Sequence, residues 1–183
     1  AATGGDVRLE DMRLDHLDPV TDKLREAGVT IEEEDDGTVR VTRVGPLKPI
    51  NMTTLTYPGF PTDIQAQLVS LMAITPGSSV VTETIYPDRF MHLAELNRMG
   101  ANMTQDGASA IITGVETLTG ADVMASDLRA GAALVIAGLV AKGTTIVHRI
   151  YHIDRGYESI ENKLTSLGAT IRRVSQSTAT VKI

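Results

Sequence analysis

Two stretches of the chain are apolar on nearly every side of a helix, and they set the expectation for the whole fold. Residues 64–74 and 128–141 are rich in Ile, Leu, Val, Met and Ala. A helix without a polar face has to be buried on all sides. Residues 17–27, 89–99 and 155–167 instead carry one apolar stripe at helical spacing, which predicts surface helices. The pattern therefore indicates central helices enclosed by other layers.

Extended segments alternate with these helices, and a glycine ends each predicted helix. Glycine is the usual residue where a helix stops, because it adopts the left-handed backbone conformation without strain. The acidic run at residues 32–36 is interpreted as a solvated turn between two strands. The predicted strands and hairpins cover residues 6–12, 29–41, 50–55, 80–86, 101–113, 145–151 and 169–183.

The order of apolar helix, strand, striped helix and hairpin occurs twice from residue 63 onward. Matched residues lie 64 to 68 positions apart, namely Asp63/Asp127, Gly77/Gly143, Ile85/Ile150, Tyr86/Tyr151, Arg89/Arg155 and Gly100/Gly168. The N-terminal residues fit the same plan but lack its opening helix. We predict one domain over residues 1–183, with units at about 1–43, 44–114 and 115–183. The expected fold class is α/β, an inside-out α/β barrel of three repeated units with central buried helices, outer sheets and an incomplete first unit.

Composition and charge narrow the possible functions. The formal net charge of -6 argues against a nucleic-acid partner. No apolar run approaches the roughly 20 residues that a membrane span needs, so no membrane partner is expected. The absence of cysteine excludes disulfides and thiolate metal sites, and the four histidines lack the spacing of a metal site. We expect no metal, no cofactor and a cytoplasmic location.

The segment at residues 57–67, YPGFPTDIQAQ, places Asp63 at or beside the start of the first apolar helix. Its prolines and glycine force a turn. An aspartate at a helix start commonly caps the exposed backbone N–H groups. A carboxylate there can also act as a general base that accepts the proton of an alcohol. From these residues alone, capping is the favoured role.

Three further motifs accompany this segment, TETIYPDRFMH at 82–92, ASDLRA at 125–130 and IYHIDRGYE at 150–158. With these motifs and the repeat, nearly the whole chain resembles the enolpyruvyl transferases, and within them the members that act on a nucleotide sugar. Such enzymes have two inside-out domains that clamp the substrates between them. The chain looks like the C-terminal one, and the small residues at 1–5, which read as the tail of a helix, also suggest part of a larger protein.

The resemblance implies transfer of the enolpyruvyl group of phosphoenolpyruvate to the 3-hydroxyl of UDP-N-acetylglucosamine, with release of phosphate. This is the first committed step of peptidoglycan synthesis. The expected partners are the two substrates and an N-terminal domain, which in the family carries a Lys–Asn pair and a loop with a Cys or Asp. Because this chain has neither, we expect it to be inactive alone, and we expect the exposed face to self-associate.

The resemblance assigns catalytic roles to three residues. Asp63 corresponds to the aspartate that contacts the sugar 3-hydroxyl and serves as the candidate general base. Arg155 is expected to bind phosphoenolpyruvate, whose carboxylate and phosphate both match a planar guanidinium. Asp127 is expected near the reacting carbon, in proton transfer or in orienting an arginine. For Asp127, a helix cap is the structural alternative.

Four residues are expected to bind substrate beside these. Arg89 and Arg129 are expected to line the same site as Arg155, with a solvated arginine or an ion pair within the domain as the alternative. Ile85 matches a position that touches the nucleotide sugar through its backbone, and Tyr86 a neighbour of the uracil. Without the resemblance, both would be read as packing residues at a strand end.

Two other functions stay open at this point. One is a non-catalytic domain that binds a nucleotide sugar or a partner, favoured by the absence of the Lys–Asn pair and of the Cys loop. The other is an enolpyruvyl transferase with a different acceptor alcohol.

Overall fold

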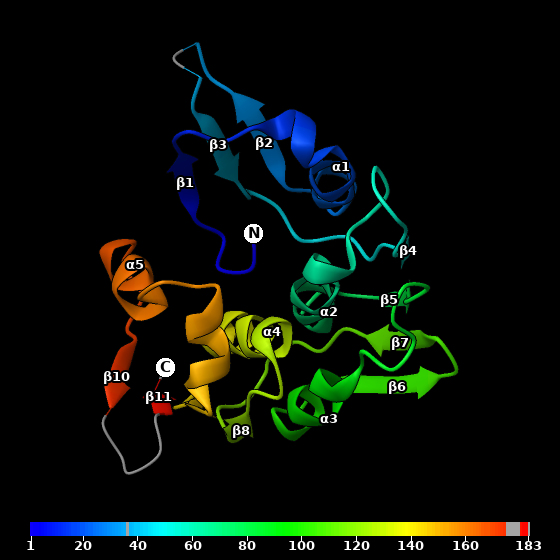
Figure 1. Ribbon diagram of the computed structural model, residues 1–183, viewed down its shortest axis with the longest axis vertical. Helices are drawn as coiled ribbons and strands as arrows, with labels where there is room; N and C mark the ends of the chain where they lie inside the picture. The colour runs from blue at the N-terminus through cyan, green and yellow to red at the C-terminus, as the bar shows by residue number, and fades with distance from the viewer. Residues whose placement is uncertain (36, 175–179, 183) are drawn as a thin grey trace.

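The computed structural model describes residues 1–35, 37–174 and 180–182, with side chains for the first two ranges. Figure 1 shows three sheets arranged around two helices, α2 (Gln65–Ala73) and α4 (Leu128–Val140). These two helices pack against each other at the centre of the molecule. The α/β fold with central helices and outer sheets is the one predicted from the two all-apolar segments.

Two of the sheets have the same strand order. The second sheet runs β4-β5-β7-β6 and the third runs β8-β9-β11-β10. In each, the first two strands are parallel and the remaining neighbours antiparallel. The first sheet, β1-β3-β2, is antiparallel and has the same order without the leading strand. This shared order is what a repeated sequence unit produces.

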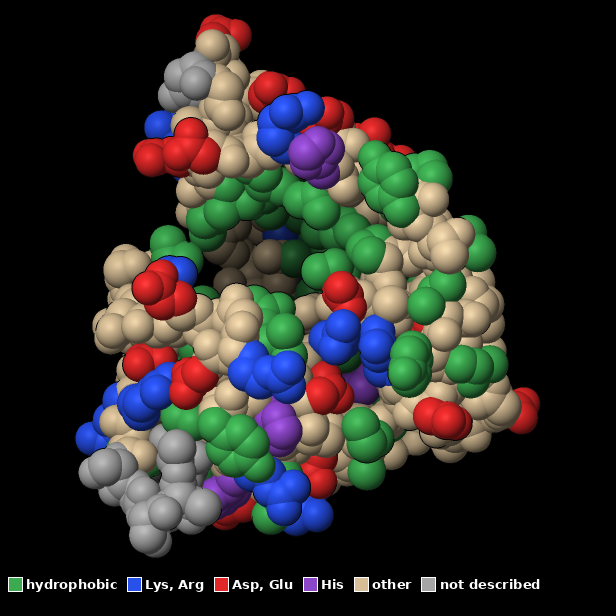
Figure 2. Space-filling view, in the orientation of Figure 1, with side chains coloured by type: hydrophobic (Ala, Val, Ile, Leu, Met, Phe, Trp, Pro, Cys, Tyr) green, Lys and Arg blue, Asp and Glu red, His purple; other side chains and the backbone are tan. Residues whose placement is uncertain are grey.

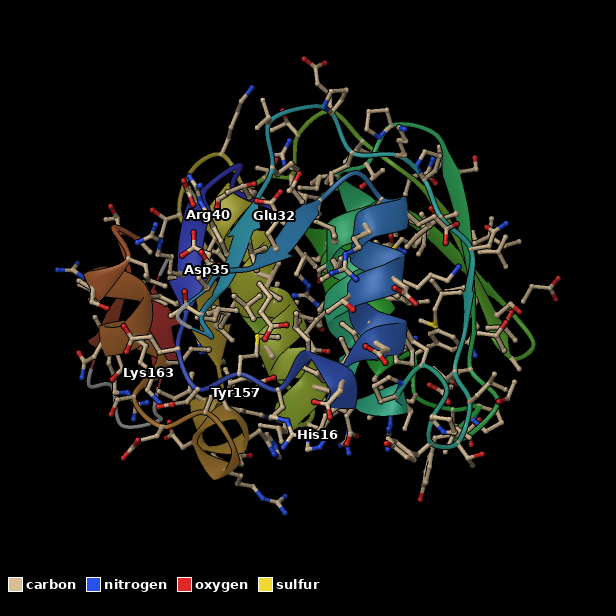
Figure 3. All side chains as sticks on the ribbon, turned by 90° about the horizontal axis from the view of Figure 1, so that it is seen from above. His16, Glu32, Asp35, Arg40, Tyr157 and Lys163 are labelled. Carbon is tan, nitrogen blue, oxygen red and sulfur yellow. The ribbon has the colours of Figure 1, made fainter. Side chains whose placement is uncertain are left out.

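The strands are short. Their bounds are β1 (Asp6–Leu9), β2 (Thr30–Glu33), β3 (Val39–Thr42), β4 (Met52–Thr53), β5 (Ser78–Thr82), β6 (Asn102–Asp106), β7 (Ser109–Thr113), β8 (Asp122–Met124), β9 (Ile146–His148), β10 (Arg172–Val174) and β11 (Thr180–Lys182). The prediction of a turn over the whole acidic run was wrong for its first part, because Glu32 and Glu33 lie in β2 and pair with β3. Glu34 and Asp35 follow the strand and lead into the turn, and Glu32 and Asp35 are labelled in Figure 3. Asp36, residues 175–179 and Ile183 lie outside the described residues.

Each sheet is accompanied by one of the striped helices, α1 (Asp18–Glu26), α3 (Met91–Arg98) or α5 (Ile160–Ser166). Three short 3-10 helices connect the elements, η1 (Leu14–His16), η2 (Thr62–Ile64) and η3 (Ile150–Arg155). The chain leaves α1, α3 and α5 through Gly28, Gly100 and Gly168, whose φ angles lie near +90°. This is the left-handed helix stop that the sequence predicted.

The central helices are buried because they lack a polar face. In α2, every residue except Gln67 is buried, and the Ser70 hydroxyl donates to the carbonyl of Ala133 in α4 at 2.9 Å. Glycine and alanine in α4 allow the close approach of its neighbours. A Cβ on Gly131 would lie 2.5 Å from Cγ1 of Ile153 in η3, so only glycine fits there without rearrangement.

Several predicted boundaries were wrong. β5 ends at Thr82, so Ile85 and Tyr86 lie in the following loop, where their N–H groups bind the Glu83 side chain instead of a neighbouring strand. β9 ends at His148 because Arg149 has a left-handed backbone, with φ of 57°. The predicted strand 145–151 therefore gives way to a 3-10 helix at residue 150.

Two predicted helix starts and one strand also differ. Arg89 precedes α3, and Arg155 ends η3, so neither arginine opens an α-helix. The segment between Arg155 and α5 instead passes through Ser159, which has a left-handed backbone. β8 was not predicted, because its three residues are too few to show an alternating pattern.

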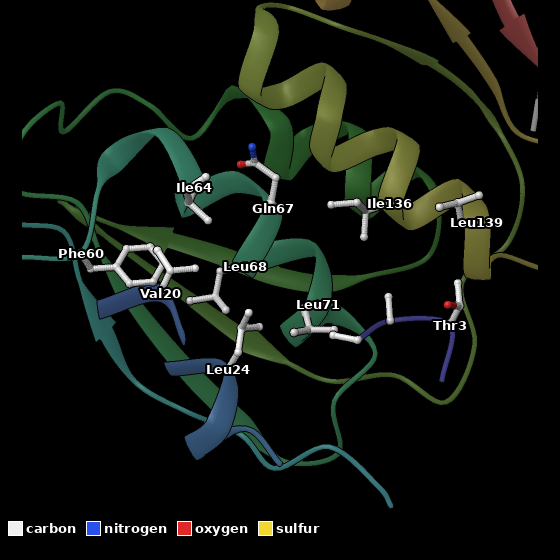
Figure 4. Close-up of a pocket in the computed structure, with 12 residues that line it drawn as sticks. Thr3, Val20, Leu24, Phe60, Ile64, Gln67, Leu68, Leu71, Ile136 and Leu139 are labelled. Atoms are coloured by element: carbon white, nitrogen blue, oxygen red, sulfur yellow. The ribbon is translucent and has the colours of Figure 1, made fainter. Parts of the chain in front are cut away.

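An apolar groove lies between α1, the helix beside the first sheet, and the central helices α2 and α4. The first sheet has no counterpart of α2 or α4 among the described residues. A cavity of about 300 Å³ lies on that side, lined by Val20, Leu24, Leu68, Leu71, Ile136 and Leu139. Figure 2 shows the hollow and its hydrophobic wall, and Figure 4 shows these side chains pointing into it. The expectation that α4 is buried on all sides was wrong for this face, where the part-exposed Ile136 and Leu139 line the cavity.

Candidate active site

Asp127 forms the N-cap of α4. Its backbone is extended, with φ of -156°, and its Oδ1 accepts hydrogen bonds from the N–H groups of Arg129 at 2.7 Å and Ala130 at 3.1 Å. These N–H groups have no partner within the helix, so the carboxylate satisfies both and also lies at the positive end of the helix dipole. The cap is thus present, and Oδ1 is occupied by the backbone.

Asp63 lies at the equivalent place beside α2 but makes no capping hydrogen bond. It is the middle residue of η2, and the N-terminal flanking residues of η2 and α2, Pro61 and Ile64, have no side-chain cap either. The Asp63 side chain is 64% exposed. The expected cap hydrogen bond is therefore absent, because the 3-10 helix η2 precedes α2. Asp63 is instead an acidic residue in the first turn of η2.

Two arginines from different elements converge on Asp63. Arg129, in the first turn of α4, places both Nε and Nη2 at 2.5 Å from Asp63 Oδ1. Arg89, in the loop before α3, places Nη1 at 3.6 Å from the same oxygen. Asp63 Oδ2 accepts no hydrogen bond from any residue in the described part of the chain. Asp63 Oδ1 is thus held by the arginines, whereas Oδ2 has no hydrogen-bond donor among the described residues.

The loop after β5 is organised by Glu83, a residue that sequence reasoning missed. Glu83 is fully buried. Its carboxylate accepts hydrogen bonds from the hydroxyls of Thr54 and Thr62, both at 2.7 Å, and from the N–H groups of Ile85 and Tyr86, both at 2.9 Å. Burial alone would raise the pKa of Glu83, but these four hydrogen bonds favour the charged form and lower the pKa below its usual value.

Arg89 is tied to this loop as well as to Asp63. Its Nη1 donates to the hydroxyl oxygen of Thr62 at 2.6 Å, and its guanidinium carbon lies 4.8 Å from the centre of the Tyr86 ring. Only 16% of the Arg89 side chain is exposed, against 29% for Arg129. The structure therefore brings together Asp63, Arg89, Arg129 and Tyr86, four of the residues that the sequence singled out.

Arg155 lies nearby but is not joined to this cluster. Its side chain is exposed, and it forms no ion pair with any described residue. The next residue, Gly156, packs against Leu128 in the first turn of α4, which places the backbone of Arg155 beside the same helix end. Tyr157 follows, and its hydroxyl accepts a hydrogen bond from Gln67 of α2 at 3.1 Å.

His92 is a second buried ionisable group near the site. It is 2% exposed, and its Nε2 has no hydrogen-bond partner among the described residues. Burial lowers the pKa of His92 to about 4, and the negative charge of Asp127 acts in the opposite direction. The imidazole is therefore neutral at pH 7.

The face over the starts of α2 and α4 thus carries both signs of charge, as Figure 2 shows below the apolar hollow. Guanidinium groups offer bidentate binding to carboxylate or phosphate, and an exposed carboxylate offers a proton acceptor. No group of three or more His, Cys, Asp or Glu suited to a metal ion occurs among residues 1–35, 37–174 and 180–182. Over the same residues, no helix has the length and apolar character needed to cross a membrane.

The sequence matches the family described as EPSP synthase (3-phosphoshikimate 1-carboxyvinyltransferase) over residues 1–164. It is 60% identical over 175 residues to UDP-N-acetylglucosamine 1-carboxyvinyltransferase 2 of Carboxydothermus hydrogenoformans, covering 95% of this chain and 42% of that protein. It is 56% identical to UDP-N-acetylglucosamine 1-carboxyvinyltransferase of Granulibacter bethesdensis, covering 96% of this chain and 41% of that protein. The chain thus spans about two fifths of the length of these curated relatives.

Solved structures give the same picture of the fold. The enolpyruvyl transferase NikO from Streptomyces tendae superimposes with a TM-score of 0.79 at 30% identity, over 87% of this chain and 37% of that one. EPSP synthase from Acinetobacter baumannii superimposes with a TM-score of 0.69 at 21% identity, over 97% of this chain and 41% of that one. At 21% identity, the second comparison supports the fold alone.

Proposed function

Because this chain belongs to the EPSP synthase family of enolpyruvyl transferases, we propose that it forms part of an enzyme that acts on UDP-N-acetylglucosamine. The reaction is transfer of the enolpyruvyl group of phosphoenolpyruvate to the sugar 3-hydroxyl, with release of phosphate. Two curated relatives with this activity in their names, at 60% and 56% identity, support the choice of acceptor.

The observation that carries this proposal is the state of Asp63. An exposed carboxylate that does not cap its helix, with Oδ1 held by Arg129 and Oδ2 free of protein donors, is arranged to meet a ligand. An alcohol is a poor nucleophile until a base within hydrogen-bond reach accepts its proton. In this proposal, Asp63 Oδ2 accepts the proton of the sugar hydroxyl while the hydroxyl oxygen attacks C2 of phosphoenolpyruvate, the enol carbon that bears the phosphate.

The remaining residues bind and orient the substrates. Addition of the hydroxyl, with a proton delivered to the methylene carbon, gives a tetrahedral intermediate. Loss of a methyl proton and of phosphate then restores the double bond. Arg155, Arg89 and Arg129 are proposed to hold the carboxylate and phosphate. Ile85 and Tyr86 would contact the nucleotide sugar. Asp127 is proposed to act near the reacting carbon, with its Oδ1 bound to the start of α4.

The proposal has consequences for partners and location. Because the relatives are more than twice as long as the matched region, we propose that turnover requires a second domain that closes over this face. We also propose a cytoplasmic role in peptidoglycan synthesis, and hence in cell-wall formation and division. Without the second domain, this face is proposed to self-associate, which light scattering tests directly: a monomeric mass would contradict it.

A chimera tests the function. This chain replaces the matched region of the Carboxydothermus relative, and phosphate release from phosphoenolpyruvate is measured with and without UDP-N-acetylglucosamine. We expect release that depends on the nucleotide sugar, and a loss of about 100-fold or more in the rate for Asp63→Ala. Asp106→Ala, an exposed aspartate at the end of β6, is the matched control and should leave the rate unchanged.

The chimera also separates the alternatives. Release of phosphate with shikimate 3-phosphate but not with UDP-N-acetylglucosamine would overturn the proposed acceptor. A folded chimera that binds the nucleotide sugar without releasing phosphate would instead favour the non-catalytic binding domain. An unchanged rate in Asp63→Ala would remove Asp63 from the chemistry and leave the activity to be explained by other residues.

A further inference from the structure

Glu83 combines a high degree of burial with a full charge, and no role in the proposed reaction accounts for it. A buried carboxylate is unfavourable unless its oxygens accept enough hydrogen bonds. Here the four donors are two threonine hydroxyls and two successive backbone N–H groups, with all four distances between 2.7 and 2.9 Å. The carboxylate is therefore fully partnered, and these partners lie on three different segments of the chain.

The first segment held by Glu83 is the loop of Ile85 and Tyr86. Both N–H groups donate to Oε1, which fixes the backbone just beyond the end of β5. Thr54 donates to the same oxygen while its hydroxyl accepts from the N–H of Thr84 at 2.9 Å. Three consecutive N–H groups that leave the sheet are thus bound within one buried polar network.

The second segment is reached through Thr62. Its hydroxyl donates to Oε2 of Glu83 and accepts from Nη1 of Arg89. Because one O–H can donate only once, the bond to Glu83 turns the lone pairs of Thr62 toward Arg89. Arg89 in turn lies at Asp63 and over the ring of Tyr86. The Glu83 carboxylate therefore binds the loop of Ile85 and Tyr86 directly and is linked to Arg89 through Thr62.

We propose that Glu83 is a positioning residue for acceptor recognition. It holds the backbone of Ile85 and Tyr86 directly and orients Arg89 through Thr62, so that the nucleotide-sugar surface and Asp63 keep a fixed relative geometry. This inference rests on the proposed function for the identity of the acceptor, but the network itself is a property of the free chain.

The first test needs no substrate. Amide hydrogen exchange at Ile85 and Tyr86 is measured by NMR in this chain and in Glu83→Ala, Glu83→Gln and Thr62→Val. We expect exchange at both amides to speed up about tenfold or more in Glu83→Ala, since each loses its acceptor. Gln keeps one acceptor oxygen for these N–H groups and should rescue most of the protection. Thr62→Val should leave the amides of Ile85 and Tyr86 protected, because it removes only the hydroxyl that links Glu83 to Arg89.

The second test uses the chimera. Glu83→Ala should raise the KM for UDP-N-acetylglucosamine about tenfold, with a smaller change in the KM for phosphoenolpyruvate. Glu83→Gln should recover most of this loss. Ser109→Ala removes a neighbouring hydroxyl that bonds Thr82 at 2.8 Å outside the network, and it should change neither KM.

The outcomes of the two tests are distinguishable. Unchanged exchange at Ile85 and Tyr86 in Glu83→Ala would overturn the inference whatever the enzyme does. Faster exchange with equal changes in both KM values would also overturn it, because the effect would then be general loosening. If Glu83→Ala fails to fold, Thr62→Val carries the test in the chimera: losing the link from Glu83 to Arg89 should raise the KM for UDP-N-acetylglucosamine, and an unchanged KM would overturn the inference. If the parent chimera releases no phosphate, the proposed function fails and the exchange result still decides the network.

Discussion

Asp63 and Asp127 occupy the same place in two copies of one repeat, yet they have opposite surroundings. Asp127 has an extended backbone, and its Oδ1 accepts hydrogen bonds from two N–H groups at the start of its own helix. Asp63 lies one 3-10 turn before its helix and makes its contacts with Arg129 and Arg89, which come from other elements. One aspartate completes a helix, and the other is left available at the surface.

Asp63 and Asp127 therefore show that equivalent residues of two repeat units can lie at the same place in the fold and still make different contacts. The central helices and the sheet order are shared between the second and third units. The starts of α2 and α4 differ in sequence and in backbone conformation. Asp127 caps α4 directly, whereas the 3-10 helix η2 precedes α2 and Asp63 contacts two guanidinium groups.

The largest expected effect is on the pH dependence of stability, through His92 near Asp127. The folded chain holds the pKa of His92 at about 4, against 6.5 for an ordinary histidine. Between these values the unfolded chain binds a proton that the folded chain does not, so the free energy of unfolding falls as the pH drops from 6.5 to 4. This single group contributes roughly 3 kcal/mol over the window, and urea unfolding at several pH values measures it.

The control for this prediction is the difference between variants. His92→Gln should flatten the slope between pH 6.5 and 4, whereas His152→Gln, a half-buried histidine in η3, should not. Asp127→Asn should extend the loss to lower pH, because removing the nearby charge lowers the pKa of His92 further. An equal slope in His92→Gln and the parent chain would contradict the prediction.

The next effect concerns packing at equivalent positions, Gly131 in α4 and Gln67 in α2. Gly131→Ala should destabilise the chain by about 1 to 3 kcal/mol, since the added Cβ meets the buried and branched Ile153 at 2.5 Å. Gln67→Ala loses only the bond to Tyr157 and should cost about 1 kcal/mol or less. Chemical denaturation measures both, and adding Ile153→Ala should relieve part of the first loss relative to the sum of the single changes. A more stable Gly131→Ala would show that helix propensity outweighs the steric contact.

The sequence predicted the elements whose signal is spread over many residues. The apolar stretches of α2 and α4 are long enough to show that no polar face exists, and the hairpins carry regular alternation. The boundary after β5 was missed because Thr82 to Tyr86 continues in residues that favour strands, while the ladder ends where Glu83 captures the following N–H groups. A local sequence pattern does not show whether a backbone N–H group binds a neighbouring strand or a buried side chain.

The candidate site was predictable in its residue types and less so in its contacts. Asp63 and Arg129 are 66 positions apart in the chain, so only the packing of α2 against α4 brings them together. Glu83 looks like a solvent-exposed acid in the sequence, because nothing local marks the threonines that partner it. Asp63 and Asp127 precede similar residues, Ile-Gln-Ala and Leu-Arg-Ala, so the sequence could not tell a cap from an uncapped turn.

The smallest expected effect is the most direct comparison of the two aspartates. Asp127→Ala should lower the free energy of unfolding by about 1 kcal/mol, because two N–H groups at the start of α4 lose their acceptor. Asp63→Ala should change it by less than about 0.5 kcal/mol, since an ion pair at an exposed carboxylate contributes little.

Urea unfolding at pH 7.5, where His92 is neutral in both states, measures this pair of variants, and Asp127→Ser is the matched control because serine also caps helices. Equal losses in Asp63→Ala and Asp127→Ala would contradict the division of tasks. In that case the bridge from Asp63 to Arg129 would stabilise the contact between α2 and α4 as much as the cap stabilises α4. Asp63 would then need a structural explanation before a catalytic one. A loss confined to Asp127→Ala and recovered by serine leaves Asp63 as a residue that folding does not require, which is the condition expected of a group kept for its chemistry.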